Sequence, residues 1–361
     1  MKKVGILTFH NVINYGGVLQ CMALQDFLQT CNYEVEVINY KSKHIDANNK
    51  LINFSSMPYL IKSILTFPFN YIRKTKYNKF IKNNLNLTNE IKNYDELKKL
   101  CEETYDYIII GSDQVWNSEI TGKESDVYFL ENINVKKLSY AASTGDDKIS
   151  DINRIIKNNS DFVAISVREE STYKKLLSKN IKAELNIDPT LLLKTDYWNT
   201  KTTIATVNND NCLLLYILGK NDKINQFCDF IRKEKKIKKI YTFSKQRFGI
   251  KGIKSIATSG PLEFLNYFKS SKYILTNSFH GTVFSIIFKK EFFVMLPPKR
   301  PERIISLLNK LGLENRIIYD IENLTEIIKD KIDYENIDKK LEDERNKSFK
   351  YITKIIGGKI K

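Results

Sequence analysis

The stretch Leu275-Thr-Asn-Ser-Phe-His-Gly-Thr-Val-Phe-Ser-Ile-Ile-Phe288 joins the end of an apolar strand pattern directly to the pattern of a helix. Residues 272–275 predict a strand, a polar turn follows, and residues 282–288 predict a helix. A helix that begins directly after a strand presents unpaired backbone N–H groups and the positive end of its dipole, so the turn predicts an anion-binding site. His280, one of three histidines in 361 residues, lies at this junction and can move protons near neutral pH.

These features predict acid–base chemistry on an anionic substrate. His280 is the expected catalytic group, and the anion contacts are expected from Ser278, Gly281 and Thr282. The alternative is that His280 has only a structural role.

The same alternation of strands and helices extends outward over the chain. Residues 3–9, 17–30 and 34–40 predict a strand, a helix and a second strand. Further strands are expected at 106–111, 138–142, 162–167, 212–218, 239–243 and 292–296. Strands that alternate with helices form a largely parallel sheet covered on both faces. We therefore predict an α/β fold of two doubly wound, Rossmann-like domains, with the active site in the inter-domain cleft.

A polar, weakly patterned segment at 199–211 is the expected linker between the domains. The N-terminal domain then covers residues 1–198 and carries a basic helical insertion at about 41–100. The C-terminal domain covers 212–333, and a helical tail follows at 334–361.

Composition restricts the class of protein. The five cysteines are scattered and form no CxxC pair, which is typical of a reducing cytoplasm and not of a disulfide framework. No apolar run approaches the ~18 residues of a membrane span. No metal-binding or P-loop motif is present, so we expect neither a metal nor a cofactor.

The formal net charge is +16, and residues 41–100, with 12 Lys/Arg and 4 Asp/Glu, contribute half of it. Aromatic residues between Tyr59 and Phe80 are interleaved with the basic ones. The segment is a solvated helical insertion, a contact for an anionic membrane surface, or a nucleic-acid contact. We expect weak membrane contact on the inner face of the plasma membrane and no nucleic acid.

Polar residues follow the strand expected at 106–111. Gly111 permits a tight turn, and Asp113 and Gln114 stand where α/β folds bind ligands. Asp113 is expected to accept a proton from a sugar hydroxyl or to orient it. The alternative is that Asp113 caps a helix while Trp116 packs in the core.

Two arginines are candidates for binding an anion. Arg168 follows a strand, and its guanidinium suits a two-bond grip on a carboxylate or phosphate. The alternative is an ion pair with Glu169, Glu170 or Asp161. Arg300, with the neighbouring Lys299 and Arg303, follows the last strand and either clamps an anion or is solvated.

Several motifs together resemble one known family. They are Gly5-Ile-Leu-Thr-Phe-His-Asn-Val-Ile-Asn-Tyr-Gly-Gly-Val-Leu-Gln20, Ile110-Gly-Ser-Asp-Gln-Val-Trp-Asn117, Leu138-Ser-Tyr-Ala-Ala-Ser143, Ile165-Ser-Val-Arg-Glu-Glu-Ser171, Asp188-Pro-Thr-Leu-Leu192 and Thr276-Asn-Ser-Phe-His-Gly-Thr-Val-Phe284. In order and spacing, over roughly residues 3–320, the chain resembles the polysaccharide pyruvyl transferases. The resemblance implies a fold like that of the GT-B glycosyltransferases. It also implies transfer of pyruvate from phosphoenolpyruvate, as a ketal, to a glycan or lipid-linked sugar.

Site residues follow from this comparison. His280 is the expected acid, Asp113 orients the acceptor, and Arg168 matches a family arginine. The acceptor is expected to contact Gln114 and the loop after the first strand, through His10, Asn11, Asn14 and Tyr15. Better-studied relatives carry a basic residue where this chain has Ser278, and Lys289, Lys290 or Arg300 are the expected substitutes.

Two other functions remain open from the sequence. The first is a GT-B-type glycosyltransferase with a nucleotide-sugar donor, whose pyrophosphate occupies the same helix N-terminus. The second is a non-enzymatic basic protein that binds lipid or nucleic acid.

Overall fold

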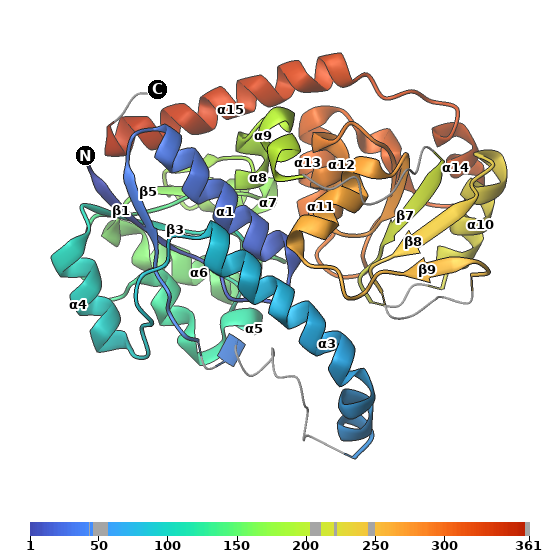
Figure 1. The fold of residues 1–361 in the computed structure, drawn as a ribbon. Helices are drawn as coiled ribbons and strands as arrows, with labels where there is room; N and C mark the ends of the chain where they lie inside the picture. Colours follow the sequence, from blue (N-terminus) through green and yellow to red (C-terminus); the bar gives the residue numbers. More distant parts are fainter. Residues whose placement is uncertain (43, 46–56, 203–210, 220–221, 245–249, 358–361) are drawn as a thin grey trace. The chain divides into compact units, whose positions relative to one another are not determined.

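The computed structural model describes the chain except for residues 43, 46–56, 203–210, 220–221, 245–249 and 358–361 (Figure 1). The chain forms two compact units. Unit 1 contains Met1–Phe67, Asn78–Leu193 and Glu342–Lys361, and unit 2 contains Pro68–Tyr77 and Lys194–Leu341.

Unit 1 is built on a parallel six-stranded sheet in the order β2-β1-β3-β4-β5-β6. Its register pairs Val4 with Val35 on one side and with Tyr107 on the other. The central strands are buried on both faces, and their sequences are therefore continuous apolar runs. The strands are β1 (Lys3–Leu7), β2 (Glu34–Val37), β3 (Tyr107–Ile110), β4 (Lys137–Ser139), β5 (Phe162–Val167) and β6 (Ala183–Leu185).

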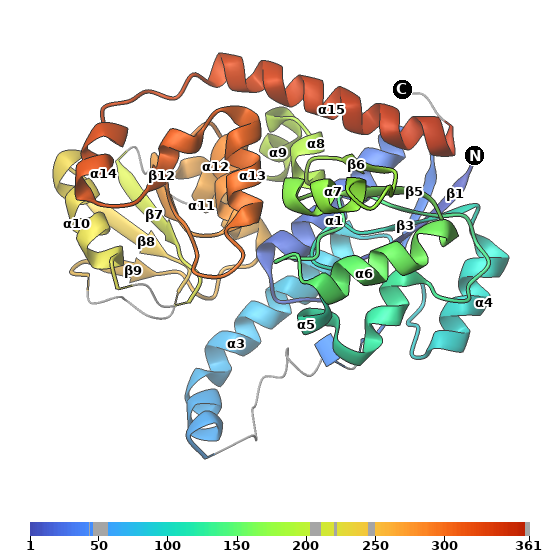
Figure 2. The same ribbon diagram turned by 180° about the vertical axis from the view of Figure 1, so that it is seen from behind.

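Helices cover both faces of this sheet. The core on one face includes side chains of α4 (Tyr94–Thr104), α6 (Ile149–Asn158) and α7 (Glu170–Leu177), and α6 and α7 stand in front in Figure 2. On the other face, α1 (Tyr15–Thr30) packs against α8 (Pro189–Leu192). Short helical segments are α5 (Ser118–Thr121), η1 (Gly122–Phe129) and η2 (Asn159–Asp161).

Unit 2 repeats this plan with a parallel sheet in the order β12-β11-β10-β7-β8-β9. Its strands are β7 (Cys212–Tyr216), β8 (Lys239–Thr242), β9 (Ile253–Ser255), β10 (Tyr273–Thr276), β11 (Glu291–Met295) and β12 (Ile317–Ile318). The core on one face includes α10 (Ile224–Glu234) and α14 (Ile321–Ile327). The remaining elements are α9 (Thr195–Lys201), α11 (Pro261–Ser270), α12 (Phe279–Ile287), α13 (Glu302–Leu311) and η3 (Glu314–Arg316).

Two long helices contribute residues to both units. In α3 (Met57–Asn84), the segment Pro68–Tyr77 belongs to unit 2, where Lys76 forms an ion pair with Glu263 of α11. In α15 (Tyr334–Ile356), residues from Glu342 onward belong to unit 1. There the Tyr351 hydroxyl donates to the Ser139 carbonyl at 2.8 Å.

The predicted fold class is confirmed, since two parallel six-stranded sheets with flanking helices are present. The units differ from the predicted domains at their edges, because α9 and part of α3 belong to unit 2 and most of the tail belongs to unit 1. Most of the expected linker, at 203–210, lies outside the described residues. Within the described part of the chain, no helix is long and apolar enough to cross a membrane.

Candidate functional site

In unit 1, polar residues gather at the carboxyl edge of the sheet, where β3 and β5 end. After β3, Gly111 has a φ of +103°, and a Cβ at this position would lie 2.9 Å from the Tyr140 carbonyl oxygen. This close approach requires glycine and turns the chain so that Asp113 follows the strand directly. After β5, Arg168 and Glu169 occupy the corresponding place, and both are buried.

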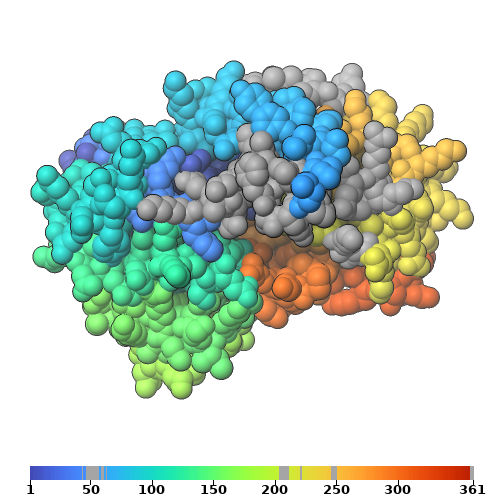
Figure 3. All heavy atoms as spheres, turned by 90° about the horizontal axis from the view of Figure 1, so that it is seen from below, coloured from blue at the N-terminus to red at the C-terminus, as the bar shows by residue number. Residues whose placement is uncertain are grey.

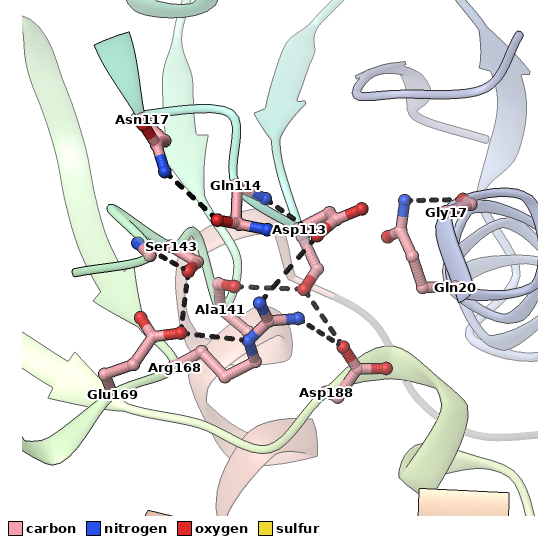
Figure 4. Close-up of polar contacts among 12 residues, drawn as sticks. Gly17, Gln20, Asp113, Gln114, Asn117, Ala141, Ser143, Arg168, Glu169 and Asp188 are labelled. Atoms are coloured by element: carbon pink, nitrogen blue, oxygen red, sulfur yellow. Dashed lines mark hydrogen bonds and ion pairs between the residues drawn. The ribbon is translucent and has the colours of Figure 1, made fainter. Parts of the chain in front are cut away.

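Arg168 lies at the centre of a buried group of carboxylates, shown in Figure 4. Its Nη1 is 2.8 Å from Asp188 Oδ2, its Nε is 3.3 Å from Glu169 Oε1, and its Nη2 is 3.8 Å from Asp113 Oδ1. Burial acts to lower the pKa of Arg168, but the three carboxylates outweigh it and raise that pKa. The guanidinium therefore stays charged, and it is one basic group among three acidic side chains.

A polar network fixes these carboxylates. Asp188 caps α8 and accepts from Thr190 N at 3.0 Å and from Thr190 Oγ1 at 2.6 Å. Glu169 accepts from Ser143 Oγ at 2.6 Å, and Asp113 accepts from Gln114 N at 2.9 Å. Held in this way, Arg168 links the ends of β5 and β6 to the turn after β3, and its predicted grip on a substrate carboxylate or phosphate stays a prediction. Of the alternative partners, Glu169 is present, whereas Asp161 and Glu170 form ion pairs with Lys137 and Lys174.

The first turn of α1 approaches the same group. Asn14 caps this helix by accepting from Gly17 N at 3.2 Å. A Cβ at Gly17 would lie 3.6 Å from Asp113 Oδ2, so the Asp113 carboxylate faces the positive end of the helix. Gln20, also on α1, is fully buried and donates to Thr8 Oγ1 and to the Gly17 carbonyl. Figure 4 shows Gln20 on the side of α1 that faces Asp113.

Several of the other residues predicted to contact the sugar acceptor are buried or already hydrogen-bonded within the protein. His10 is 3% exposed, with Nδ1 at 3.3 Å from the Thr8 carbonyl and Nε2 at 3.0 Å from Asn39 Oδ1, so both ring nitrogens contact protein oxygens. Tyr15 is buried in the first turn of α1, while Asn11 is partly buried. Gln114 Oε1 accepts from Asn117 Nδ2 at 3.0 Å. Of this set, Asn14 and Gln114 lie beside Asp113, and His10 has the contacts of a structural residue.

In unit 2, the turn between β10 and α12 is held by its own side chains. Asn277 accepts from Leu218 N at 2.7 Å and donates to the Leu218 carbonyl at 2.9 Å. Ser278 caps α12, and its hydroxyl accepts from Gly281 N at 3.4 Å. This cap starts the helix at Phe279, three residues before the predicted start, so His280 lies within the first helical turn.

The residues around this turn have separate roles. His280 is 7% exposed and contacts the ring of Phe279 edge-to-face. Gly281 is required by packing, because a Cβ there would overlap Thr276 Oγ1 and lie 3.0 Å from the Tyr216 ring. Thr282 is fully buried and donates its hydroxyl to the Ser278 carbonyl at 3.1 Å. Gly281 and Thr282 therefore shape the turn from inside, while Ser278 caps the helix and His280 lies in its first turn.

Cationic side chains surround the start of α12. The Arg303 guanidinium, on α13, lies 5.9 Å from the centre of the Phe279 ring. Burial raises the pKa of Tyr216 to about 12, while the positive charge of Arg73 and a hydrogen bond with Ser278 act to lower it. Arg73 of α3 therefore acts electrostatically on the group next to the helix cap. A histidine in the first turn of a helix, with the Arg303 guanidinium against the neighbouring Phe279 ring, suits an anion that receives a proton.

A sequence model of the polysaccharide pyruvyl transferases matches residues 14–297. The chain belongs to this family. It is therefore a transferase, and the family's role in polysaccharide synthesis implies a sugar acceptor. The non-enzymatic interpretation has no support.

Solved structures similar to this pyruvyl transferase show the same fold. UDP-GlcNAc 2-epimerase from Neisseria meningitidis, bound to UDP-GlcNAc, is 12% identical over 99% of both chains with a TM-score of 0.56. The enzyme of that name from Methanocaldococcus jannaschii is 13% identical over 92% of this chain and 93% of its own, with a TM-score of 0.53. At these identities the similarity establishes a GT-B-like fold and nothing about substrates. A search among curated proteins found no match.

Of the three residues expected to replace the basic residue found in relatives at the position of Ser278, the structure places two away from the turn. Lys289 and Lys290 follow the far end of α12, a helix about 13 Å long. Lys289 pairs with Asp338 at 2.6 Å, and Lys290 donates to the Lys269 carbonyl. Neither lysine therefore stands at the N-terminus of the transferase's α12, whereas Arg303 does. Arg300, with a φ of +59°, lies in the turn before α13.

Sequence reasoning did not connect Arg73 or Tyr216 with the turn before α12. Arg73 lies about 200 positions from Ser278 in the chain, and the basic segment around it was assigned to the surface. Tyr216 ends β7, the strand paired with β10. Tyr216 could have been found from the strand order, since the carboxyl ends of adjacent parallel strands lie together. No local signal marks Arg73.

Proposed function

We propose that this transferase moves pyruvate from phosphoenolpyruvate onto two hydroxyls of a sugar, forming a ketal. The observation that carries the proposal is the position of His280 in the first turn of α12, with Arg303 beside Phe279. Phosphoenolpyruvate carries a carboxylate and a phosphate, and a helix N-terminus with nearby arginines is suited to both groups.

The reaction requires a proton donor at this position. Protonation of C3 of phosphoenolpyruvate develops positive charge at C2, to which a sugar hydroxyl adds. Phosphate then leaves, and the second hydroxyl closes the ring. The two hydroxyls lose two protons in all, which balance the one gained at C3 and the one gained by the departing phosphate. His280 is the proposed donor to C3, and the α12 amides would stabilise the phosphate as it leaves.

The buried cluster of Arg168 and its three carboxylates in unit 1 suits the sugar acceptor. Three acidic side chains, Asp113, Glu169 and Asp188, surround one arginine, which disfavours a second anion and favours a neutral sugar that donates hydrogen bonds. Asp113 is the proposed contact for the acceptor hydroxyls, with Asn14 and Gln114 beside it. Arg168 then acts as a positioning residue that holds the carboxylates in place.

The acceptor is proposed to be a glycan or a lipid-linked sugar, and the reaction to take place in the cytoplasm. The five cysteines are free and buried, which fits a reducing compartment.

Donor identity is tested by binding and turnover together. Calorimetric titration should show binding of phosphoenolpyruvate, weakened in His280→Gln. Phosphate release from phosphoenolpyruvate should depend on an added sugar from a panel of pyranosides and lipid-linked sugars. Binding of UDP-sugars with nucleotide release, and no response to phosphoenolpyruvate, would favour the glycosyltransferase alternative instead.

A further inference from the structure

The first part of α3 exposes an unusual amount of apolar surface. Of the 15 large hydrophobic side chains exposed among the described residues, eight lie between Met57 and Ile72, and the other seven are scattered. These eight are Met57, Ile61, Ile64, Leu65, Phe67, Phe69, Tyr71 and Ile72, with exposures from 36% to 72%. Concentrated apolar surface of this kind marks an interaction site, whereas single exposed residues need no explanation.

The exposed residues follow the helical repeat. Met57, Ile61, Ile64, Leu65 and Ile72 are spaced as i, i+4, i+7, i+8 and i+15, so they lie on one face of the helix. In the second half of α3 the apolar residues behave differently, because Tyr77, Phe80 and Ile81 are buried. One half of the helix therefore packs against the protein, and the other half presents its apolar face outward, on the surface seen in Figure 3.

The charge of α3 has a single sign. Its 28 residues include no Asp or Glu, and its basic residues are Lys62, Arg73, Lys74, Lys76, Lys79 and Lys82. Lys79 and Lys82 are exposed and continue the face that carries Ile61, Ile64 and Ile72. Because the exposed apolar residues and the lysines beyond them lie on the same side of the helix, both can contact an anionic membrane surface at the same time. A protein partner would need both an apolar surface for the exposed hydrophobic residues and acidic groups for the lysines of the same helix.

We propose that this face of α3 binds anionic phospholipid membranes, with the eight exposed apolar side chains inserted at the interface and Lys74, Lys79 and Lys82 against the headgroups. This inference is independent of the proposed donor chemistry, so it can fail while the transferase activity stands. The sequence left open whether the aromatic residues pack inward. Tyr77 and Phe80 do so, but Phe67, Phe69 and Tyr71 are exposed. The side chain of Tyr59 lies outside the described residues.

The test is co-sedimentation of the full-length protein with vesicles of phosphatidylcholine and phosphatidylglycerol. Bound protein should increase with the phosphatidylglycerol fraction and decrease with added salt, because the lysine contribution is screened. The charge variant K74Q/K79Q/K82Q should lose most binding. Its matched control, K339Q/K347Q/K350Q on α15, removes the same charge from exposed positions elsewhere and should bind like wild type.

The apolar contribution is tested by a second pair. The variant I64Q/L65Q should bind at least 10-fold more weakly at every salt concentration. The control I149Q/L177Q removes two side chains of comparable exposure elsewhere and should have no effect. Absence of binding to phosphatidylglycerol vesicles at low salt, or equal loss in variant and control, would overturn the proposal. A wild-type dimer that I64Q/L65Q converts to a monomer in sedimentation velocity would overturn it too, because a second copy would then cover this face.

Discussion

Replacing Arg168 by methionine should destabilise unit 1 strongly. The guanidinium is 3% exposed and lies within 3.8 Å of three carboxylates. The side chains of Asp188 and Glu169 are at most 1% exposed. Methionine fills much of the volume but leaves these charges without a cation. Removing one partner of a buried ion pair costs about 3–5 kcal/mol. For a unit of about 200 residues, this corresponds to a decrease in Tm of roughly 6–20 °C.

The loss should also depend on pH. Without Arg168, the pKa values of the buried carboxyls rise above their unfolded values, so the native state binds more protons than the unfolded state. The stability of the variant then increases as pH falls. The difference in stability between wild type and variant should decrease toward about pH 4, where the carboxyls of the unfolded chain are protonated too. A simple packing defect would show no such dependence. Calorimetric melting of R168M and wild type between pH 5 and pH 8 measures both effects.

The matched control is Arg154→Met, also in unit 1. Arg154 forms ion pairs with Asp126 and Glu131, but its side chain is 25% exposed, so the expected loss is about 1 kcal/mol or less. The reasoning would be refuted if R168M melted like wild type at every pH while its KM for phosphoenolpyruvate increased. Arg168 would then be a direct contact of the substrate anion.

Four further outcomes are expected. His280→Gln should lower kcat by about 10²–10⁴-fold with unchanged melting, as loss of a general acid does; normal turnover would remove His280 from the mechanism. Arg73→Gln should raise the KM for phosphoenolpyruvate roughly 10-fold or more and R73K should largely restore it, whereas a change in acceptor KM alone would contradict its assignment to the donor. Gly281→Ala should lower the free energy of unfolding by about 1–3 kcal/mol, because its Cβ overlaps Thr276 Oγ1, and equal chemical denaturation of both proteins would contradict that. Burial raises the pKa of Cys31 to about 11, so its reaction with a disulfide reagent at pH 8 should be at least ~100-fold slower than for a thiol of pKa 9 and should accelerate up to about pH 11.

The elements that the sequence could predict are those whose signal is local. The strand, cap and helix around His280 are consecutive in the chain, and the apolar strands β3 and β10 are buried along their whole length. The edge strands β6, β9 and β12 were not predicted, because two or three residues carry no period. Edge strands are commonly this short, since long open edges promote aggregation.

Features that depend on contacts between distant parts of the chain were harder to predict from the sequence. Asp188 reaches Arg168 because β5 and β6 are neighbours in the sheet, a relation that no spacing in the sequence records. The apolar pattern of residues 57–72 ordinarily predicts burial, and only the structure distinguishes the exposed half of α3 from its buried half. The site proposed at the α12 turn was predicted from consecutive residues, whereas the influence of Arg73, from α3, on Tyr216 had no local signal.

The division of α15 has a consequence for how the protein is made. Residues from Glu342 onward belong to unit 1, where Arg345 donates to the Leu191 carbonyl and Ser348 accepts from Asn186. Everything in unit 2 is synthesised before this segment leaves the ribosome. Unit 1 therefore lacks part of its chain until all of unit 2 has been synthesised, so it cannot be completed first, as N-terminal domains usually are.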